Sequence, residues 1–303
     1  MTARRRYENY HEGKCRKNID GTSFVVFCFW KKRATFHRLV TKKKSDLRME
    51  NREMTNTTLK EFFEKYPKAA IAFSGGVDSS YLLSMGIQYG ADVKAYYVKS
   101  QFQPEFELED AVRLGQQLNA NMEIIHVNVL ENEAVVKNPE NRCYYCKQSI
   151  FGTILAKAAA DGYTVILDGT NASDDAGDRP GMKALQEMKV LSPLRLCGLT
   201  KAEIRKRSKK AGLFTWDKPA YACLATRIPT GMQITAELLK RVEGAEGELF
   251  AMGFSDFRVR VRENGALLQF NKEQMEDALA RRSEIEERLS PWFDKLLPDW
   301  EMR

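Results

Sequence analysis

The sequence lacks any apolar run that approaches the ~18 residues of a membrane span. Residues 24–30 are apolar, but Lys31, Lys32 and Arg33 follow at once, and this pattern does not fit a signal peptide. The chain has six cysteines, and without a secretion signal disulfides are not expected. No internal repeat is present. The sequence therefore excludes membrane-spanning proteins, secreted disulfide scaffolds and repeat proteins.

The basic charge of the chain is confined to its first part. Of a net charge of +7 over 303 residues, residues 1–53 carry +9 and the remainder carries −2. A basic leader is typical of nucleic-acid binding, but this segment has few periodic features, and Met54 begins a regular pattern. We predict that residues 1–53 are disordered or lie outside the fold. A chain that starts at Met54 is expected to be soluble and active.

Strand and helix patterns alternate after Met54. The predicted strands are residues 69–73, 93–98, 122–127 and 164–167, and the predicted helices between them are residues 79–89, 105–118 and 147–160. Strands separated by helices favour βαβ units and an α/β fold, a parallel sheet flanked by helices with ligands at the carboxyl ends of its strands.

A second, smaller α+β domain is predicted after an irregular stretch over residues 216–231. Its helix covers residues 236–252, two strands follow at 257–261 and 266–270, and a charged helix covers 272–289. The predicted domains are therefore 54–230, which holds the cysteines that follow Met54, and 231–303.

A glycine-rich turn, SGGVDS, joins the first predicted strand to the next helix at residues 74–79. Its glycines let the backbone turn tightly and direct N–H groups at an anion, beside a helix N-terminus. It is not a Walker loop, because no Gly-Lys-Ser/Thr follows the glycines. Asp78 supplies instead a hard oxygen ligand suited to Mg²⁺. The turn predicts a polyphosphate site.

The cysteines after Met54 suggest a metal centre. Cys143 and Cys146 form a CxxC, the spacing that lets two thiolates reach one centre, and Cys223 lies on the irregular stretch. Three thiolates can hold a 4Fe-4S cluster with one iron free. A zinc site that adds Cys197 is the alternative, although the apolar residues around Cys197 favour a packed core thiol.

Several segments together resemble one family. SGGVDS resembles the PP-loop of the ATP pyrophosphatases, which leave AMP on an oxygen of their substrate. Three further segments are similar to segments of the LarE family. The first comprises residues 168–171 (DGTN) with 174–175, 178–181 and 192–194, the second residues 218–227, and the third residues 260–262 followed by Gly265. Those enzymes are ATP-dependent sulfur transferases that make the nickel-pincer nucleotide cofactor of lactate racemase. The resemblance covers residues 56–275 of the chain.

The resemblance implies the substrate and the site, with ATP bound by the predicted domain 54–230 and substrate or phosphate by 231–303. The substrate is a pyridinium dicarboxylate mononucleotide, whose carboxylates are adenylated by ATP with Mg²⁺ and then exchange oxygen for sulfur. The implied catalytic residues are Cys223, Asp78 and Arg227. Pyrophosphate is assigned to Ser74, Gly75, Gly76, Val77 and Ser79, the nucleotide to Asn171, Mg²⁺ to Asp78 and Asp175, and the phosphates to Arg179, Arg227, Arg260 and Arg262.

The family has two forms that differ in their sulfur source. In one, the cysteine that matches Cys223 gives up its own sulfur and becomes dehydroalanine; in the other it joins a CxxC around a 4Fe-4S cluster. Because Cys143 and Cys146 are present, the chain resembles the second form. One position departs from the family, since Asn271 stands where a glutamate is usual. Asn271 is therefore left out of the predicted site.

Three other readings compete with this one. A transfer-RNA thiolase would use the same loop and cysteines, but residues 54–303 lack its basic surface, and Val77 stands where such relatives tend to carry lysine. An amide-forming synthetase needs no CxxC, and a zinc-binding module leaves SGGVDS unexplained. The expected partner is a small nucleotide in the cytoplasm, with no nucleic acid and no membrane; assembly into a homo-oligomer is left open.

Overall fold

The computed structural model describes residues 57–174, 180–263 and 265–299. The basic leader lies outside these ranges, so its predicted place outside the fold stays a prediction. The described residues belong to one compact unit, 51–303, and the predicted domain boundary near residue 230 also stays a prediction. None of the described helices combines the length and apolar character needed to cross a membrane.

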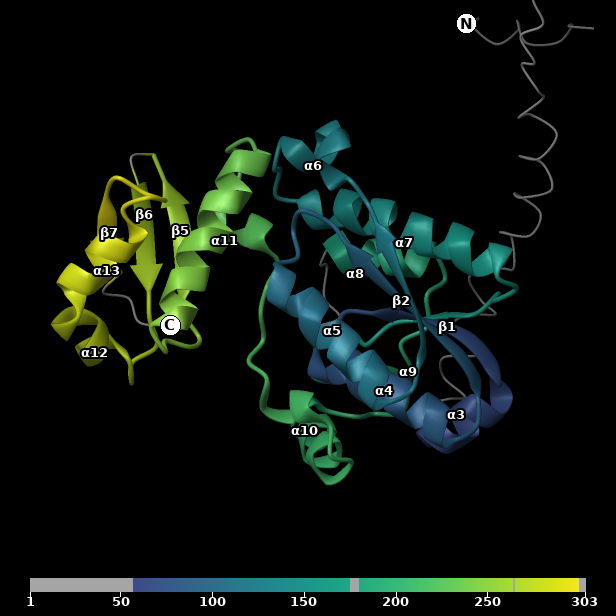
Figure 1. The fold of residues 1–303 in the computed structure, drawn as a ribbon. Coiled ribbons are helices and arrows are strands. Elements are labelled where there is room, and N and C mark those ends of the chain that lie inside the picture. Colours follow the sequence, from purple (N-terminus) through teal and green to yellow (C-terminus); the bar gives the residue numbers. More distant parts are fainter. Residues whose placement is uncertain (1–56, 175–179, 264, 300–303) are drawn as a thin grey trace, which may run out of the picture. The chain divides into compact units, whose positions relative to one another are not determined.

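A parallel sheet with the strand order β3-β2-β1-β4 forms the first part (Figure 1). Its strands are β1 (Lys68–Phe73), β2 (Asp92–Lys99), β3 (Asn121–His126) and β4 (Ile166–Leu167). Ala69, Ala70 and Ile71 of the central strand are all fully buried, as in a strand covered on both faces. The predicted parallel sheet is confirmed.

Helices cover both faces of this sheet (Figure 1). Ile71 and Tyr97 pack in one core cluster with α3 (Leu59–Lys65), α4 (Val77–Gln88), α5 (Glu105–Gln117) and α10 (Lys201–Lys210). Ala70 and Tyr96, one residue earlier in each strand, face the long helix α7 (Arg142–Ala160) instead. The alternation of side chains along each strand thus assigns the two layers of helices.

Short elements connect these layers. They are η1 (Val129–Glu131), α6 (Glu133–Val136), α8 (Pro180–Glu187), α9 (Pro193–Leu196), η2 (Phe214–Asp217) and η3 (Leu224–Arg227). The predicted start of the helix at residue 147 is wrong. Helix α7 begins at Arg142, so the CxxC lies in its first turns.

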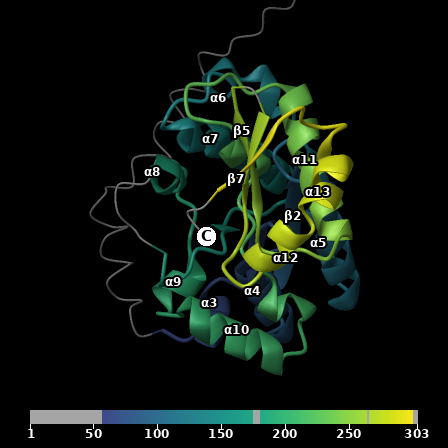
Figure 2. The same ribbon diagram turned by 90° about the vertical axis from the view of Figure 1, so that its left-hand side faces the viewer.

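The second part is α+β, as predicted. It contains α11 (Ala236–Ala251), β5 (Arg258–Arg262), β6 (Gly265–Gln269) and β7 (Leu296–Pro298). Strand β6 lies between its neighbours, antiparallel to β5 and parallel to β7. Figure 2 shows α11 and α13 on the same side of this small sheet.

The predicted helix over residues 272–289 is wrong as a single element. It divides into α12 (Met275–Ala280) and α13 (Arg282–Leu289). Arg281 lies at the break with non-helical φ and ψ of −99° and 20°, and its guanidinium donates to the carbonyl of Met252 at the end of α11. This tertiary contact accounts for the interruption, and no proline or glycine marks it in the sequence.

Candidate active site

The glycine-rich turn forms the tight connection that the sequence predicts. Gly75 has φ +71°, and Gly76 caps helix α4. The hydroxyls of Ser74 and Ser79 lie 3.1 Å apart, and the Ser79 hydroxyl donates to the carbonyl of Gly76. A Cβ on Gly75 would lie 3.3 Å from the carbonyl oxygen of Glu107, so helix α5 packs directly on the turn. Glycine is required here for both conformation and space.

Asp78 lies in the first turn of α4 and contacts a lysine that the sequence analysis missed. Lys201 Nζ donates to Asp78 Oδ2 at 2.6 Å. Burial raises the pKa of Asp78, and the contact with Lys201 only partly opposes this. Lys201 begins helix α10 after the Thr200 cap, and nothing local in the sequence places this helix start beside the turn. Lys201 brings a positive charge to the predicted polyphosphate site from a separate helix.

The segment after β4 packs against the same turn. A Cβ on Gly169 would lie 2.9 Å from the backbone nitrogen of Ser79, so the two loops touch. The side chain of Asn171 is buried, and its Oδ1 accepts from the backbone N–H of Ser173. Asn171 also contacts the side chain of Asp78, so it lies beside the phosphate turn, and its nucleotide role stays a prediction. The predicted residues Asp175 and Arg179 lie outside the described residues.

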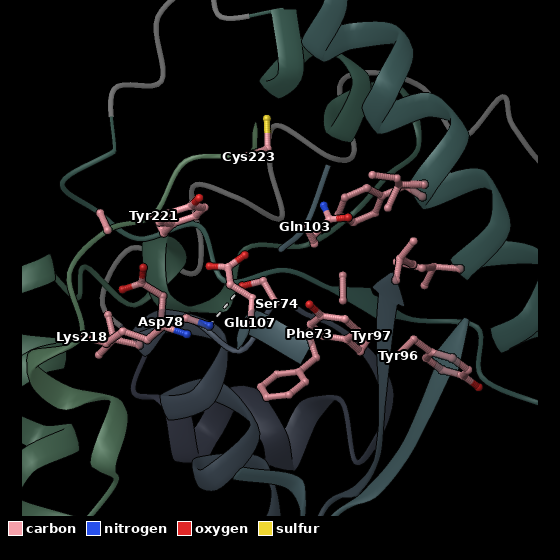
Figure 3. Close-up of a pocket in the computed structure, with 18 of the residues that line it drawn as sticks. Phe73, Ser74, Asp78, Tyr96, Tyr97, Gln103, Glu107, Lys218, Tyr221 and Cys223 are labelled. Carbon is pink, nitrogen blue, oxygen red and sulfur yellow. Dashed lines mark hydrogen bonds between the residues drawn. The ribbon is translucent and has the colours of Figure 1, made fainter. Parts of the chain in front are cut away.

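One pocket joins the phosphate turn to the cysteine-bearing segment (Figure 3). Its volume is about 380 Å³. Ser74 and Asp78 line it on the side of the turn, Glu107 lines it from α5, and Tyr221 and Cys223 line it from the irregular segment. The structure therefore brings Cys223 and the phosphate turn to one cavity, although they are far apart in the sequence.

Arginines from separate elements hold the segment that carries Cys223. Residues 216–227, here called the cysteine segment, contain only short 3-10 turns, so most of its carbonyls need other partners. The donors and their acceptor carbonyls are Arg205 to Trp216 and Lys218, Arg258 to Ala220, Arg227 to Ala222, Arg142 to Ala225 and Arg260 to Thr226, at 2.7–3.1 Å. These contacts fix an irregular backbone, and no local pattern in the sequence predicts them.

Arg227 is the most deeply buried of these arginines. It is 1% exposed, and its Nε and Nη2 donate to the two carboxylate oxygens of Glu246 at 2.8 and 3.1 Å. The guanidinium also lies 4.5 Å from the ring centroid of Tyr221, whose hydroxyl donates to the same carboxylate. Glu246 thus neutralises the charge that the sequence analysis assigned to a phosphate. A phosphate contact of Arg227 stays a prediction.

Arg260 and Arg262 share a face of the edge strand β5, as predicted from their spacing. Arg260 donates to Gln269 and to the carbonyl of Thr226, so it belongs to the support of the cysteine segment. Arg262 is exposed and lines a separate hollow with Arg241 and Met232. The structure therefore does not bring Arg262 to the pocket of Asp78 and Cys223.

Replacing Glu246 with glutamine is expected to destabilise the protein by about 3–5 kcal/mol, because it leaves the buried Arg227 charge uncompensated. Urea unfolding followed by circular dichroism measures the change. The matched control is Glu286→Gln, which removes an exposed Arg282–Glu286 pair with a 2.7 Å contact and is expected to cost less than about 1 kcal/mol. Equal losses in both variants would show that burial of the Arg227 pair has no special effect.

The thiols of Cys143, Cys146 and Cys223 interact with one another. Cys143 and Cys146 are three residues apart on α7, so they share a helix face. Burial, then the negative charges of Cys223 and Cys143, raise the pKa of Cys146 to about 12. Burial also raises the pKa of Cys223, opposed by Arg142 and Arg227. Cys197 packs in the core cluster on the α4 side of the large sheet, whereas Cys146 and Cys223 pack in another.

Within the described ranges, no three His, Cys, Asp or Glu side chains are arranged to hold a single metal ion. A 4Fe-4S cube keeps its cysteines farther apart than one ion does. The soft donor set of three interacting thiols, with arginine guanidinium groups to balance thiolate charge, fits such a cluster by its chemistry. The three thiols do not form a closed tetrahedral zinc site with Cys197, because Cys197 packs in a different hydrophobic core.

Comparison with known proteins finds relatives over most of the chain, although no family model matches it. An uncharacterised protein of Synechocystis is 38% identical over 219 residues, which are 72% of this chain and 82% of that protein. The pyridinium-3,5-bisthiocarboxylic acid mononucleotide synthase of Lactiplantibacillus plantarum is 28% identical over 234 residues, 77% of this chain and 85% of that protein. The tRNA-specific 2-thiouridylase MnmA of Thermotoga maritima is 24% identical over 189 residues, 48% of this chain and 52% of that protein.

Proposed function

Because this chain belongs to the LarE family of ATP-dependent sulfur transferases, we propose that it converts pyridinium-3,5-biscarboxylic acid mononucleotide into the bisthiocarboxylic acid. The observation that carries the proposal is a pocket lined by both Asp78 and Cys223. A site that activates with ATP and then transfers sulfur needs its phosphate turn and a cysteine thiol at one cavity. The product would serve the nickel-pincer cofactor of lactate racemase.

Activation of the carboxylate is the first task. A carboxylate oxygen is a poor leaving group, so sulfur cannot replace it directly. Transfer of AMP from ATP gives an acyl-adenylate, and the released pyrophosphate fits the turn around Gly75 and Gly76, at the N-terminus of α4. Asp78 would hold Mg²⁺ on the phosphates, and Lys201, which contacts it at 2.6 Å, would add a second positive charge. Both offset the charge that develops on the leaving pyrophosphate.

Sulfur transfer is the second task. Cys143, Cys146 and Cys223 would hold a 4Fe-4S cluster, whose fourth iron can carry an exchangeable sulfide. The arginines that donate to the carbonyls of Ala222, Ala225 and Thr226 would fix the backbone on both sides of Cys223. The four described cysteines are free thiols, and we place the reaction in the cytoplasm, where thiols stay reduced.

Product analysis tests the proposal directly. Protein purified without oxygen, mixed with the biscarboxylic substrate, ATP, Mg²⁺ and sulfide, is expected to form one AMP and one pyrophosphate for each oxygen replaced by sulfur. Liquid chromatography with mass spectrometry detects the intermediate and the product after two rounds. Transfer RNA in place of the mononucleotide is the control substrate, chosen because the MnmA relative acts on tRNA and matches 48% of the chain. Thiolated transfer RNA without thiolated mononucleotide would contradict the proposal.

A further inference from the structure

We propose that the carboxylate of Glu107 accepts the proton that the sulfur nucleophile loses when it attacks the acyl-adenylate. This inference rests on the proposed function and adds to it a residue that the predicted site did not include. Glu107 lies in the first turn of α5, the helix that follows β2, and its side chain lines the pocket shared by Ser74 and Cys223 (Figure 3).

The position of Glu107 is fixed from two sides. Its own carbonyl packs against the phosphate turn, 3.3 Å from where a Cβ of Gly75 would lie. One turn later on α5, Asp110 forms an ion pair of 2.7 Å with Lys218, a residue of the cysteine segment. Phe106 stacks edge-on against Tyr221 of the same segment, with ring centroids 5.0 Å apart. Helix α5 therefore ties the phosphate turn and the cysteine segment together, and Glu107 faces the cavity between them.

The surroundings of Glu107 suit proton exchange near neutrality. Burial and, to a smaller extent, the charge of Asp110 raise the pKa of Glu107 to about 7, although Lys218, Arg227 and Lys99 oppose the rise. The hydroxyl of Tyr97, from β2, also lines the pocket and has no hydrogen-bond partner among the described residues. The negative charge of Glu107 contributes to the raised pKa of Tyr97, which places the two groups near each other. A base is most useful when its pKa lies near the working pH.

The proton balance of the transfer step requires an acceptor. Hydrosulfide attacks the acyl carbon, the carbon–sulfur bond forms, and the carbon–oxygen bond to AMP breaks with its electron pair on the phosphate oxygen. The product is a thiocarboxylate anion, because a thiocarboxylic acid is too strong an acid to stay protonated at pH 7. The proton of the former S–H group therefore passes to Glu107 and then to water. Asp78 is less suited to this task, since Lys201 already contacts its carboxylate.

The test separates the two half-reactions. Glu107→Gln is expected to retain pyrophosphate release from ATP and substrate, but to slow thiocarboxylate formation by roughly 10²-fold or more, the usual loss on removal of a general base. Glu105→Gln is the matched control on the same helix turn, because Glu105 is exposed, pairs with Lys99 and does not line the pocket. This control is expected to leave both half-reactions within twofold of the original protein.

The pH profile distinguishes a base from a structural residue. Glu107 must be deprotonated to act, so its contribution is present above its pKa and lost below it. Sulfide itself titrates in this range, and the ratio of the original rate to the Glu107→Gln rate cancels that effect. We expect this ratio to rise about tenfold between pH 6 and pH 8 and then to level off. A ratio that does not change with pH, or equal losses in both half-reactions, would overturn the role of Glu107.

A substrate-free measurement completes the test. In protein labelled with ¹³C at glutamate carboxyls, one resonance is expected to titrate near pH 7 and to be missing from Glu107→Gln. If every glutamate carboxyl titrates below pH 5.5, Glu107 is not the proton acceptor, even if thiolation occurs. If the original protein forms no thiocarboxylate at all, the proposed function fails and this inference fails with it.

Discussion

Asp78→Ala is expected to abolish pyrophosphate release from ATP, with a loss of roughly 10²–10³-fold or more, while the protein stays folded. The reason for the loss is that Asp78 is the acid in the phosphate turn, placed by the first turn of α4 where Mg²⁺ would meet the phosphates. The reason for the intact fold is that burial raises the pKa of this carboxyl. Its charge is thus unfavourably placed without a metal, and its removal costs little stability.

A pyrophosphate assay with saturating substrate measures the effect. Asp277→Ala is the control, because Asp277 on α12 is exposed and does not line the pocket of Asp78. Thermal unfolding of both variants checks that the fold is kept. Full pyrophosphate release by Asp78→Ala would remove the assignment of the turn as the ATP site, whatever the outcome for the cysteines.

Alanine at Cys143, Cys146 or Cys223 is expected to remove repeated sulfur transfer and the brown colour of an iron–sulfur cluster together. Each thiol would supply one of three ligands, so the loss of one opens the cluster to decay. Cys197→Ala is the matched control and should keep both colour and turnover, because Cys197 packs in a separate core cluster. Iron and sulfide analysis, a visible spectrum and product counts per chain after anaerobic purification measure these effects.

Different results are expected if the chain works as the form of the family in which the cysteine gives up its own sulfur. In that form only Cys223 is needed for sulfur transfer, so Cys143→Ala stays active for a single turnover. Cys223 itself loses the mass of hydrogen sulfide as it becomes dehydroalanine. Mass spectrometry after reaction with substrate separates the two cases. An intact Cys223 after several turnovers supports the cluster, whereas dehydroalanine at this position contradicts it.

The order of strands and helices and the phosphate turn were predictable because they depend on local patterns. The turn over residues 74–79 combines a buried strand, two glycines and a helix start, and each is visible within a few neighbouring residues. The N-terminal limit of α7 was not predictable, because Arg142 begins that helix while its side chain donates to Asn138 and to the distant carbonyl of Ala225. The break at Arg281 likewise depends on a contact with the end of α11.

The chemistry of the arginines was the least predictable part of the site. A sequence shows which arginines lie near a motif, but not whether a buried carboxylate has already neutralised them. Arg227 follows Cys223 closely and was assigned to a phosphate, yet Glu246, on α11, accepts two of its hydrogen bonds. Lys201 shows the converse case. It lies at an ordinary helix start, and its Nζ is 2.6 Å from Asp78 Oδ2.

The support of the cysteine segment also has a consequence for the order of folding. Its carbonyls accept from guanidinium groups spread between Arg142 and Arg260, so the segment reaches its final path only after distant parts of the chain have come together. Contacts of such long sequence separation form late, because loop-closure entropy opposes them until the surrounding elements are in place. A partly folded chain would therefore keep Cys223 apart from Cys143 and Cys146. The three thiols would become neighbours only in the finished protein, which limits premature capture of metal during synthesis.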